Sequence, residues 1–538
     1  MNAPTASPTK KELLSPQSFK LHLLGESLIV GVAAGLVISL YRFGISRLNQ
    51  AMQSFLGQAA DQLTSLLLFA GALLIGALVA GFCYQKEPLI SGSGIPQVSA
   101  QLKGRLRPAW FKVLFYKFCG GLMTLGGGLT LGREGPSVQI GAALGQGLGD
   151  LMRRPHLERR YLIVSGAGAG LAAAFNAPIA GVIFALEEMH RHLSSFALVS
   201  AMVASFTANY MAGLFYGQHP VLFFTDVKAL PLHFYPVILL TGLLVGLSGV
   251  LFNKLIMLGK GLYARLHLPP LLAGLLPFAV VGVACCIWPV LFGSGEHLIF
   301  LPVEGFKPLP QIVILYLTKL LLLVICFGSG LPGGIFFPLL VLGSLVGQGT
   351  GLVLQQAGLF PTELILTLSL MAMAGHFAAI VRAPLTGIIL ISEMTGSFAN
   401  MLPLGLISLI AYLTAELCHS EPIYESLEKA LHRPTKPPFS STDSPGAKAG
   451  TSGNGRSLAE FPVEPNSPAD GQLVARLTWP ANLILVAVRR GSEEFIPKGD
   501  FRLQAGDYLL ALYEQSETTA IRQAVLALTK TRSVIAPK

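Results

Sequence analysis

The sequence predicts an all-α polytopic membrane protein built from two homologous halves, followed by a small α+β domain outside the membrane. Of its 538 residues, 52% are hydrophobic and only 12% are charged, whereas an average soluble protein has about 25% charged residues. Several uncharged runs reach the roughly 20 residues that cross a bilayer. The membrane region also repeats itself, and a Pro/Gly/Ser-rich break separates it from a shorter C-terminal region.

The membrane region is expected between residues 21 and 432. Residues 1–20 are polar and contain three lysines, which predicts a cytosolic segment rather than a cleavable signal peptide. Basic residues also follow the last apolar run, so the positive-inside rule places both termini in the cytoplasm. This bias explains the net charge of +10 without a nucleic-acid partner, because no basic stripe with interleaved aromatic residues occurs. The uncharged runs are Leu63–Phe82, Phe234–Phe252, Pro269–Gly295, Pro338–Pro361 and Met401–Ala415.

An internal repeat divides this region into halves of about 21–230 and 231–432. A shift of 202 residues places Lys117 on Lys319 and Gly132 on Gly334. A shift of 206 residues places NAPIAGVIFALE on RAPLTGIILISE, with Glu187 on Glu393. Two homologous membrane halves are typical of transporters, whose sites lie at the repeat interface and use broken helices.

Three Gly/Pro clusters mark where such helices begin: GSGIP (92–96), GREGP (132–136) and GSGLPGGIFFP (328–338). A helix start has unpaired N–H groups and roughly half a positive charge, so converging starts predict an anion site. Glu134 lies in one of these first turns, where its carboxylate can take the place of a mobile anion and leave when protonated. The alternative is a carboxylate that only satisfies the helix dipole. The supporting residues are Gly92, Gly94, Gly132, Arg133, Gly135 and Gly334.

Other kinds of site are disfavoured by the residue types. Carboxylates are few and no His/Cys spacing fits a metal, so no metal and no cofactor are expected. No nucleophile elbow, P-loop or catalytic constellation occurs, which predicts that the protein is not an enzyme.

The region after the last span separates into a linker, residues 433–457, and a domain, residues 458–538. The linker is rich in Pro, Gly and Ser. Leu483–Arg490 and Gly506–Glu514 predict strands, and the residues after a Ser516 cap predict a terminal helix.

The membrane motifs resemble those of the CLC chloride channels and transporters. GSGIPQ, GREGP and GGIFFP are similar to the three anion-site signatures of that family, and 166–189 and 382–395 also resemble it. The resemblance implies the CLC fold: two inverted-topology repeats of tilted, broken helices in a homodimer. It implies an anion held by the Ser93 hydroxyl, the Ile335 and Phe336 amides and the Tyr424 phenol. Glu134 would be the outer gating glutamate, and Lys117 matches a buried lysine.

The same resemblance bears on mechanism. In ALEEMH, Glu188 matches the inner proton glutamate of the exchangers, whereas Glu187 is interpreted as structural. The chain is therefore predicted to be an H⁺/Cl⁻ antiporter. A passive voltage- or pH-gated chloride channel is the alternative, and a membrane scaffold for the C-terminal domain is a third hypothesis.

The C-terminal region resembles the ligand-binding domain of TrkA-type regulators, on the evidence of its hydrophobic spacing and AGDYLLAL. The implied partner is a small regulatory ligand such as a nucleotide. Together with the absence of CBS pairs, this resemblance predicts a prokaryotic plasma membrane location, with chloride, the lipid bilayer and a second copy of the chain as the other partners.

Overall fold

A computed structural model of the chain describes residues 16–58, 62–190, 195–224, 227–266, 269–305, 307–431, 456–464, 467–490, 493–514 and 518–529. The chain separates into two compact units, Met1–Thr435 and Lys436–Lys538. The first unit is helical, and the second combines a sheet with one long helix.

The first unit contains seven helices, among the described residues, that are long and apolar enough to cross a membrane. The elements of its first half are α1 (Pro16–Gln58), α2 (Leu63–Lys86), η2 (Pro88–Ile90), α3 (Ile95–Leu102), α4 (Trp110–Gly126), α5 (Glu134–Leu151), α6 (His156–Phe175), α7 (Pro178–Phe184), η3 (Ala185–His190) and α8 (Ser195–Tyr216).

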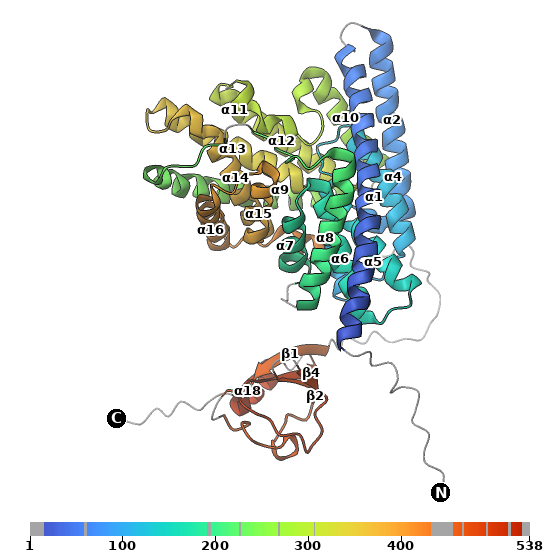
Figure 1. Cartoon of the computed structure of the whole chain (residues 1–538), viewed down its shortest axis with the longest axis vertical. Coiled ribbons are helices and arrows are strands. Elements are labelled where there is room, and N and C mark those ends of the chain that lie inside the picture. Colours follow the sequence, from blue (N-terminus) through green and yellow to red (C-terminus); the bar gives the residue numbers. More distant parts are fainter. Residues whose placement is uncertain are drawn as a thin grey trace. The chain divides into compact units, whose positions relative to one another are not determined.

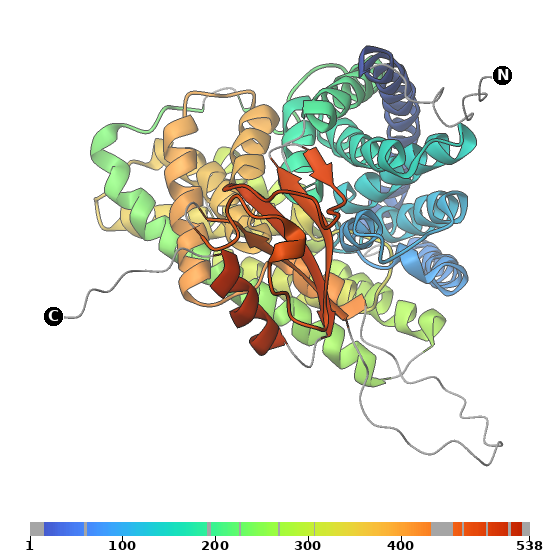
Figure 2. The same ribbon diagram turned by 90° about the horizontal axis from the view of Figure 1, so that it is seen from below.

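The second half repeats this order, and the two halves lie side by side in Figures 1 and 2. Its elements are η4 (Leu232–Phe234), α9 (Tyr235–Leu266), α10 (Pro270–Ile287), η5 (Pro289–Leu291), η6 (Glu296–Ile299), α11 (Leu301–Glu304), α12 (Leu309–Gly328), α13 (Phe336–Gln356), η7 (Thr362–Leu364), α14 (Ile365–Val381), α15 (Pro384–Thr395), α16 (Met401–Leu417) and α17 (Ile423–Leu431). Helices α4 to α7 correspond to α12 to α15, which confirms the predicted repeat.

An approximate two-fold axis passes between the halves at Gly132 and Gly334. These two residues are repeat equivalents, and they form an antiparallel bridge in which each N–H donates to the other's carbonyl at 2.7 Å. Equivalent residues that pair antiparallel are related by a two-fold rotation, as inverted repeats require.

Four of the long spans, α1, α8, α12 and α14, are not among the uncharged runs, and α1 is the longest of them. It begins at Pro16, inside the segment predicted to precede the membrane region, and it contains Glu26 and Arg42. Both side chains are buried within the unit: Glu26 pairs with Arg154, and Arg42 donates to the carbonyl of Ala173 at 2.7 Å. Charges that pair inside the bundle are tolerated in a membrane helix, so a search for uncharged runs omits it.

The second unit has a four-stranded antiparallel sheet in the order β1-β4-β2-β3, together with the terminal helix α18. Its elements are β1 (Arg456–Pro462), η8 (Val474–Arg476), β2 (Leu483–Arg490), β3 (Glu493–Phe495), β4 (Asp507–Glu514) and α18 (Thr518–Thr529). The two predicted strands and the helix are confirmed, whereas β1 and β3 were not predicted. Ser516, the expected helix cap, lies outside the described residues.

Candidate functional site

Three helices begin close together where the halves meet. α3 begins at Ile95, α5 at Glu134 and α13 at Phe336, each inside a predicted Gly/Pro cluster. The loops before α5 and α13 share the two-fold bridge, and the carbonyl of Gly92 accepts from the N–H of Gly333 at 3.0 Å. The positive ends of three helices, with their free N–H groups, therefore lie around one small region.

Glycine is required where these loops cross. Gly94 has φ +90°, and a Cβ there would lie 2.3 Å from the side-chain oxygen of Gln139. A Cβ at Gly135 would lie 2.7 Å from the Cβ of Ser93. Neither contact is sterically allowed, so these glycines permit the helix starts to approach one another.

Glu134 lies in the first turn of α5 and is 2% exposed. Its carboxylate lies beside the backbone N–H of Phe337, in the first turn of α13. Its Oε2 atom has no hydrogen-bond partner among the described residues, and the Arg133 Nε atom lies 3.9 Å from Oε1. The carboxylate is thus at the start of a helix of the other half, where a free anion would also be stabilised.

The four residues predicted to hold the anion are all buried. Ser93, Ile335, Phe336 and Tyr424 are 1%, 0%, 0% and 2% exposed. Ser93 Oγ accepts from the N–H of Ile95 at 3.3 Å, but its hydroxyl proton has no acceptor within the described ranges. The same is true of the Tyr424 hydroxyl, on a helix that packs against α3. Two hydroxyl donors therefore remain for a ligand.

Aromatic rings form an apolar wall at the start of α13. The ring of Phe336 lies 4.8 Å from Phe377, 5.3 Å from Phe175 and 6.3 Å from Phe184, measured between centroids. Such surroundings exclude water, so charges and helix dipoles act more strongly on an ion here than they would in solution.

The paired lysines support the loops rather than the anion itself. Lys117 is fully buried and donates to the carbonyls of Ile90 and Gly92 at 2.7 and 2.6 Å. Lys319 makes the equivalent bonds, at 2.8 and 2.7 Å, in the loop 291–293. Each lysine Nζ fixes one GSG loop, and Lys117 thereby fixes the backbone that carries Ser93.

Two equivalent carboxylates cap helices of opposite halves. Glu187 accepts from the N–H groups of Leu385 and Thr386 at the start of α15, at 3.2 and 2.7 Å. Glu393 accepts from the N–H groups of residues 179 and 180 at the start of α7, at 3.0 and 2.7 Å. This geometry gives Glu187 the structural role that the sequence predicted.

Glu188 lies in η3, a π-helical turn that continues α7. The corresponding helix α15 is a regular α-helix to Thr395, and Met394 takes the place of Glu188 in it. Glu188 is 4% exposed. A π-turn frequently marks a functional position.

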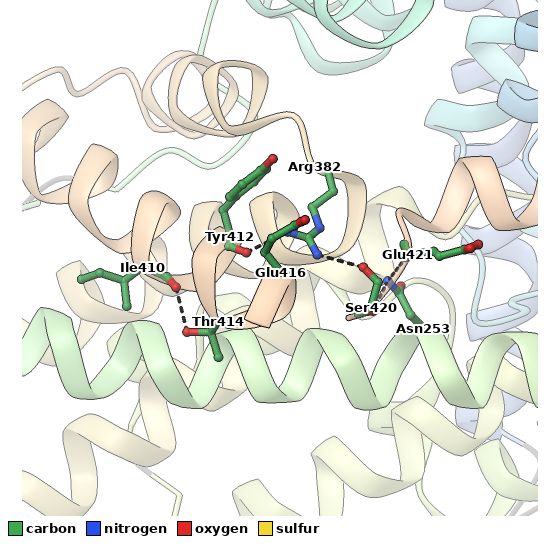
Figure 3. A network of polar contacts seen from close by, with 8 residues as sticks. All are labelled: Asn253, Arg382, Ile410, Tyr412, Thr414, Glu416, Ser420 and Glu421. Carbon is green, nitrogen blue, oxygen red and sulfur yellow. Dashed lines mark hydrogen bonds and ion pairs between the residues drawn. The ribbon is translucent and has the colours of Figure 1, made fainter. Parts of the chain in front are cut away.

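The turn before α17 is held by a polar network that the sequence did not indicate. Figure 3 shows Arg382 between Tyr412 and Ser420; its guanidinium donates to both of their carbonyls, at 2.7 and 2.8 Å. Asn253 donates to the carbonyl of Glu421 at 3.0 Å. These bonds fix the backbone just before the helix that carries Tyr424.

The far end of α17 is held by a second network, the Glu428 clamp. Glu428 is one turn beyond Tyr424 and accepts from Ser99 Oγ at 3.0 Å, Lys103 Nζ at 2.7 Å and Arg105 NH1 at 3.0 Å. Ser99 and Lys103 belong to the end of α3 and the loop after it. The clamp thus joins the helix that carries the phenol to the helix that follows Ser93.

The arrangement defines a class of protein: a helical membrane protein with a buried candidate ion site between two inverted halves. The family profile described as voltage gated chloride channel matches residues 75–416, and the profile described as TrkA-C domain matches residues 458–525. The chain belongs to the voltage gated chloride channel family.

Relatives and solved structures agree with this assignment. The H(+)/Cl(-) exchange transporter ClcA of Vibrio cholerae serotype O1 is 37% identical over 441 residues, covering 79% of this chain and 92% of the relative. The protein of the same name from Salmonella typhimurium is 35% identical over 433 residues, covering 78% and 90%. The crystal structure of a slow cyanobacterial Cl⁻/H⁺ antiporter has a TM-score of 0.70 at 32% identity and covers 76% of this chain and 97% of its own.

Proposed function

We propose that this chain exchanges chloride for protons across a bacterial membrane. The observation that carries the proposal is the position of Glu134, whose unpartnered carboxylate oxygen lies against the start of α13 in the other half. A carboxylate there competes with chloride when ionised and yields the place when protonated. Anion exchange and proton uptake then depend on the same group. The names of the relatives support the same exchange.

The remaining site residues have complementary roles in the proposed cycle. The Ser93 hydroxyl, the amides at Ile335 and Phe336 and the Tyr424 hydroxyl hold the anion. Glu188 accepts a proton from the inner side and passes it toward Glu134. Its burial and its π-turn support this role.

Proton uptake into liposomes tests the proposal. Purified protein is reconstituted with a chloride gradient and no proton gradient, and protons are expected to move against their electrochemical gradient. In Glu134→Gln, which mimics the protonated state, chloride flux should continue without proton movement. Chloride flux without proton movement in the wild-type chain would instead identify a passive channel, and no flux at all would leave the scaffold hypothesis.

The proposal extends to orientation and assembly. Eight Lys and Arg residues lie in segments 103–112 and 153–160, and the positive-inside rule places this end in the cytoplasm. The Glu428 clamp binds α17 to the same end, so the C-terminal unit is also assigned to the cytoplasm. Family membership supports a homodimer, and the TrkA-C match supports a small regulatory ligand for that unit.

A further inference from the structure

A basic cavity opens beside the Glu428 clamp, away from the residues that are proposed to carry chloride and protons. It has a volume of about 280 Å³ and lies between the end of α3, the end of α5 and the beginning of α6. Three arginines line it: Arg107 from the loop after α3, and Arg159 and Arg160 from α6.

The floor of the cavity is polar and already ordered. Gln101 Nε2 donates to Gln146 Oε1 at 2.8 Å, and Gln146 Nε2 donates to the carbonyl of Pro108 at 3.0 Å. One carboxylate, Asp150, accepts from Arg159 NH1 at 2.8 Å. It compensates one of the three guanidinium charges, so the cavity keeps a net positive charge.

The arginines lining the cavity have guanidinium N–H groups that make no hydrogen bond within the described residues. Arg107 and Arg160 make no side-chain hydrogen bond or ion pair within the described part of the chain, and Arg159 bonds only to Asp150. A guanidinium is a planar fork of N–H donors that matches the oxygens of a phosphate group. Pockets for drug-sized ligands start at roughly 300 Å³, so this cavity fits a phosphate or diphosphate group and not a complete nucleotide.

We propose that this cavity binds a phosphate-bearing anion, which is either a soluble phosphate compound or the headgroup of an anionic phospholipid. The loop 103–107 gives the site a route to the transport machinery. Lys103 and Arg105 hold Glu428, while Gly104 and Arg107 line the cavity. An anion that draws Arg107 inward therefore acts on the loop that anchors the helix of Tyr424.

Calorimetric titration of the full-length protein with pyrophosphate tests this inference. Arg107→Gln is the first variant, because Arg107 is exposed and its loss leaves the packing intact. Arg160→Gln is the second variant. Arg153→Gln is the matched control, since it removes an exposed charge at the same end outside the cavity. The wild type and the control should bind one pyrophosphate per chain, and each cavity variant should bind at least about tenfold more weakly.

A second arm separates the two sources of phosphate. The unfolding midpoint of the wild type and the three variants is measured with phosphatidylglycerol and with the same amount of phosphatidylcholine. The difference between the two midpoints is compared across these four proteins. If the wild type binds no pyrophosphate, and phosphatidylglycerol raises its unfolding midpoint but not that of the two cavity variants, the ligand is the lipid headgroup. If neither probe distinguishes the cavity variants from Arg153→Gln, the inference is wrong. Both readouts measure binding, so they stand whether or not the chain transports protons.

Discussion

Replacing Glu428 with glutamine should loosen α17 without touching the ion site directly. Glu428 is 3% exposed, whereas the side chains of Lys103 and Arg105 are 37% and 56% exposed. Solvent screening leaves each of these ion pairs worth only about 0–1 kcal/mol. The buried hydrogen bond from Ser99 to the charged carboxylate adds about 1.5 kcal/mol or more. The substitution is thus expected to cost about 2 kcal/mol of local stability.

Hydrogen exchange of peptides that cover α17 measures this cost. About 2 kcal/mol corresponds to a roughly 30-fold increase in the open population, and amide exchange should accelerate by that factor. Glu421→Gln is the control, because it removes a charge from the same segment but affects only exposed contacts, the pair with Lys429 and a hydrogen bond from Ser426. Equal exchange in the two variants would refute the clamp.

The clamp also has a predicted pH dependence. Burial raises the pKa of Glu428, but the hydrogen bonds from Lys103 and Ser99 and the charges of Lys103 and Arg105 outweigh it, so the pKa lies below its ordinary value of 4.5. A lowered carboxyl pKa stabilises the folded state at pH values above 4.5, and this contribution is lost as the pH falls through the lower, folded-state value. Protection of α17 should decline in that acidic range in the wild type, and Glu428→Gln should lack this component.

Three further predictions test other parts of the molecule. Tyr424→Phe removes a hydroxyl with no partner among the described residues, so the unfolding midpoint without chloride should not change. Calorimetry should instead show about fivefold to tenfold weaker chloride binding. A loss of stability without weaker chloride binding would contradict the proposal that the Tyr424 hydroxyl holds the anion. Glu187→Gln and Glu393→Gln should each lower stability in detergent by about 1–2 kcal/mol, because each removes an equivalent charged cap; a loss in only one would contradict their equivalence. Asp507→Asn breaks a bidentate pair between a buried carboxylate and the partly exposed Arg490 guanidinium, and it should cost the second unit about 1–3 kcal/mol, measured as faster exchange in β2 and β4. Exchange that stays at the wild-type rate would assign the pair no stabilising role.

The sequence predicted those features that depend on local chemistry. Gly/Pro clusters end one helix and begin another through neighbouring backbone groups, so the starts at Ile95, Glu134 and Phe336 could be predicted. The repeat could be found because equivalent residues such as Lys117 and Lys319 make equivalent bonds.

The Glu428 clamp could not be predicted in the same way. Its partners are more than 320 residues earlier in the chain, and nothing local to Glu428 says which of the many basic residues it meets. The only signal was a carboxylate one turn after Tyr424 on a short helix. The turn before α17 is similar, since Arg382 is bonded to backbone carbonyls and these have no sequence signature.

Structural residues occur in both symmetric halves, whereas the residues assigned to proton transport occur in only one. Residues that hold loops and helix starts occur in both halves: Lys117 with Lys319, and Glu187 with Glu393. The two carboxylates assigned to protons occur once, because their equivalents are apolar.

Phe336 stands at the position of Glu134, and Met394 at that of Glu188. The π-turn at Glu188 likewise has no counterpart in α15. A symmetric ion site would treat both sides of the membrane alike. In the proposed cycle, the single carboxylates Glu134 and Glu188 give a proton a different route from that of the anion, and both ions meet at Glu134.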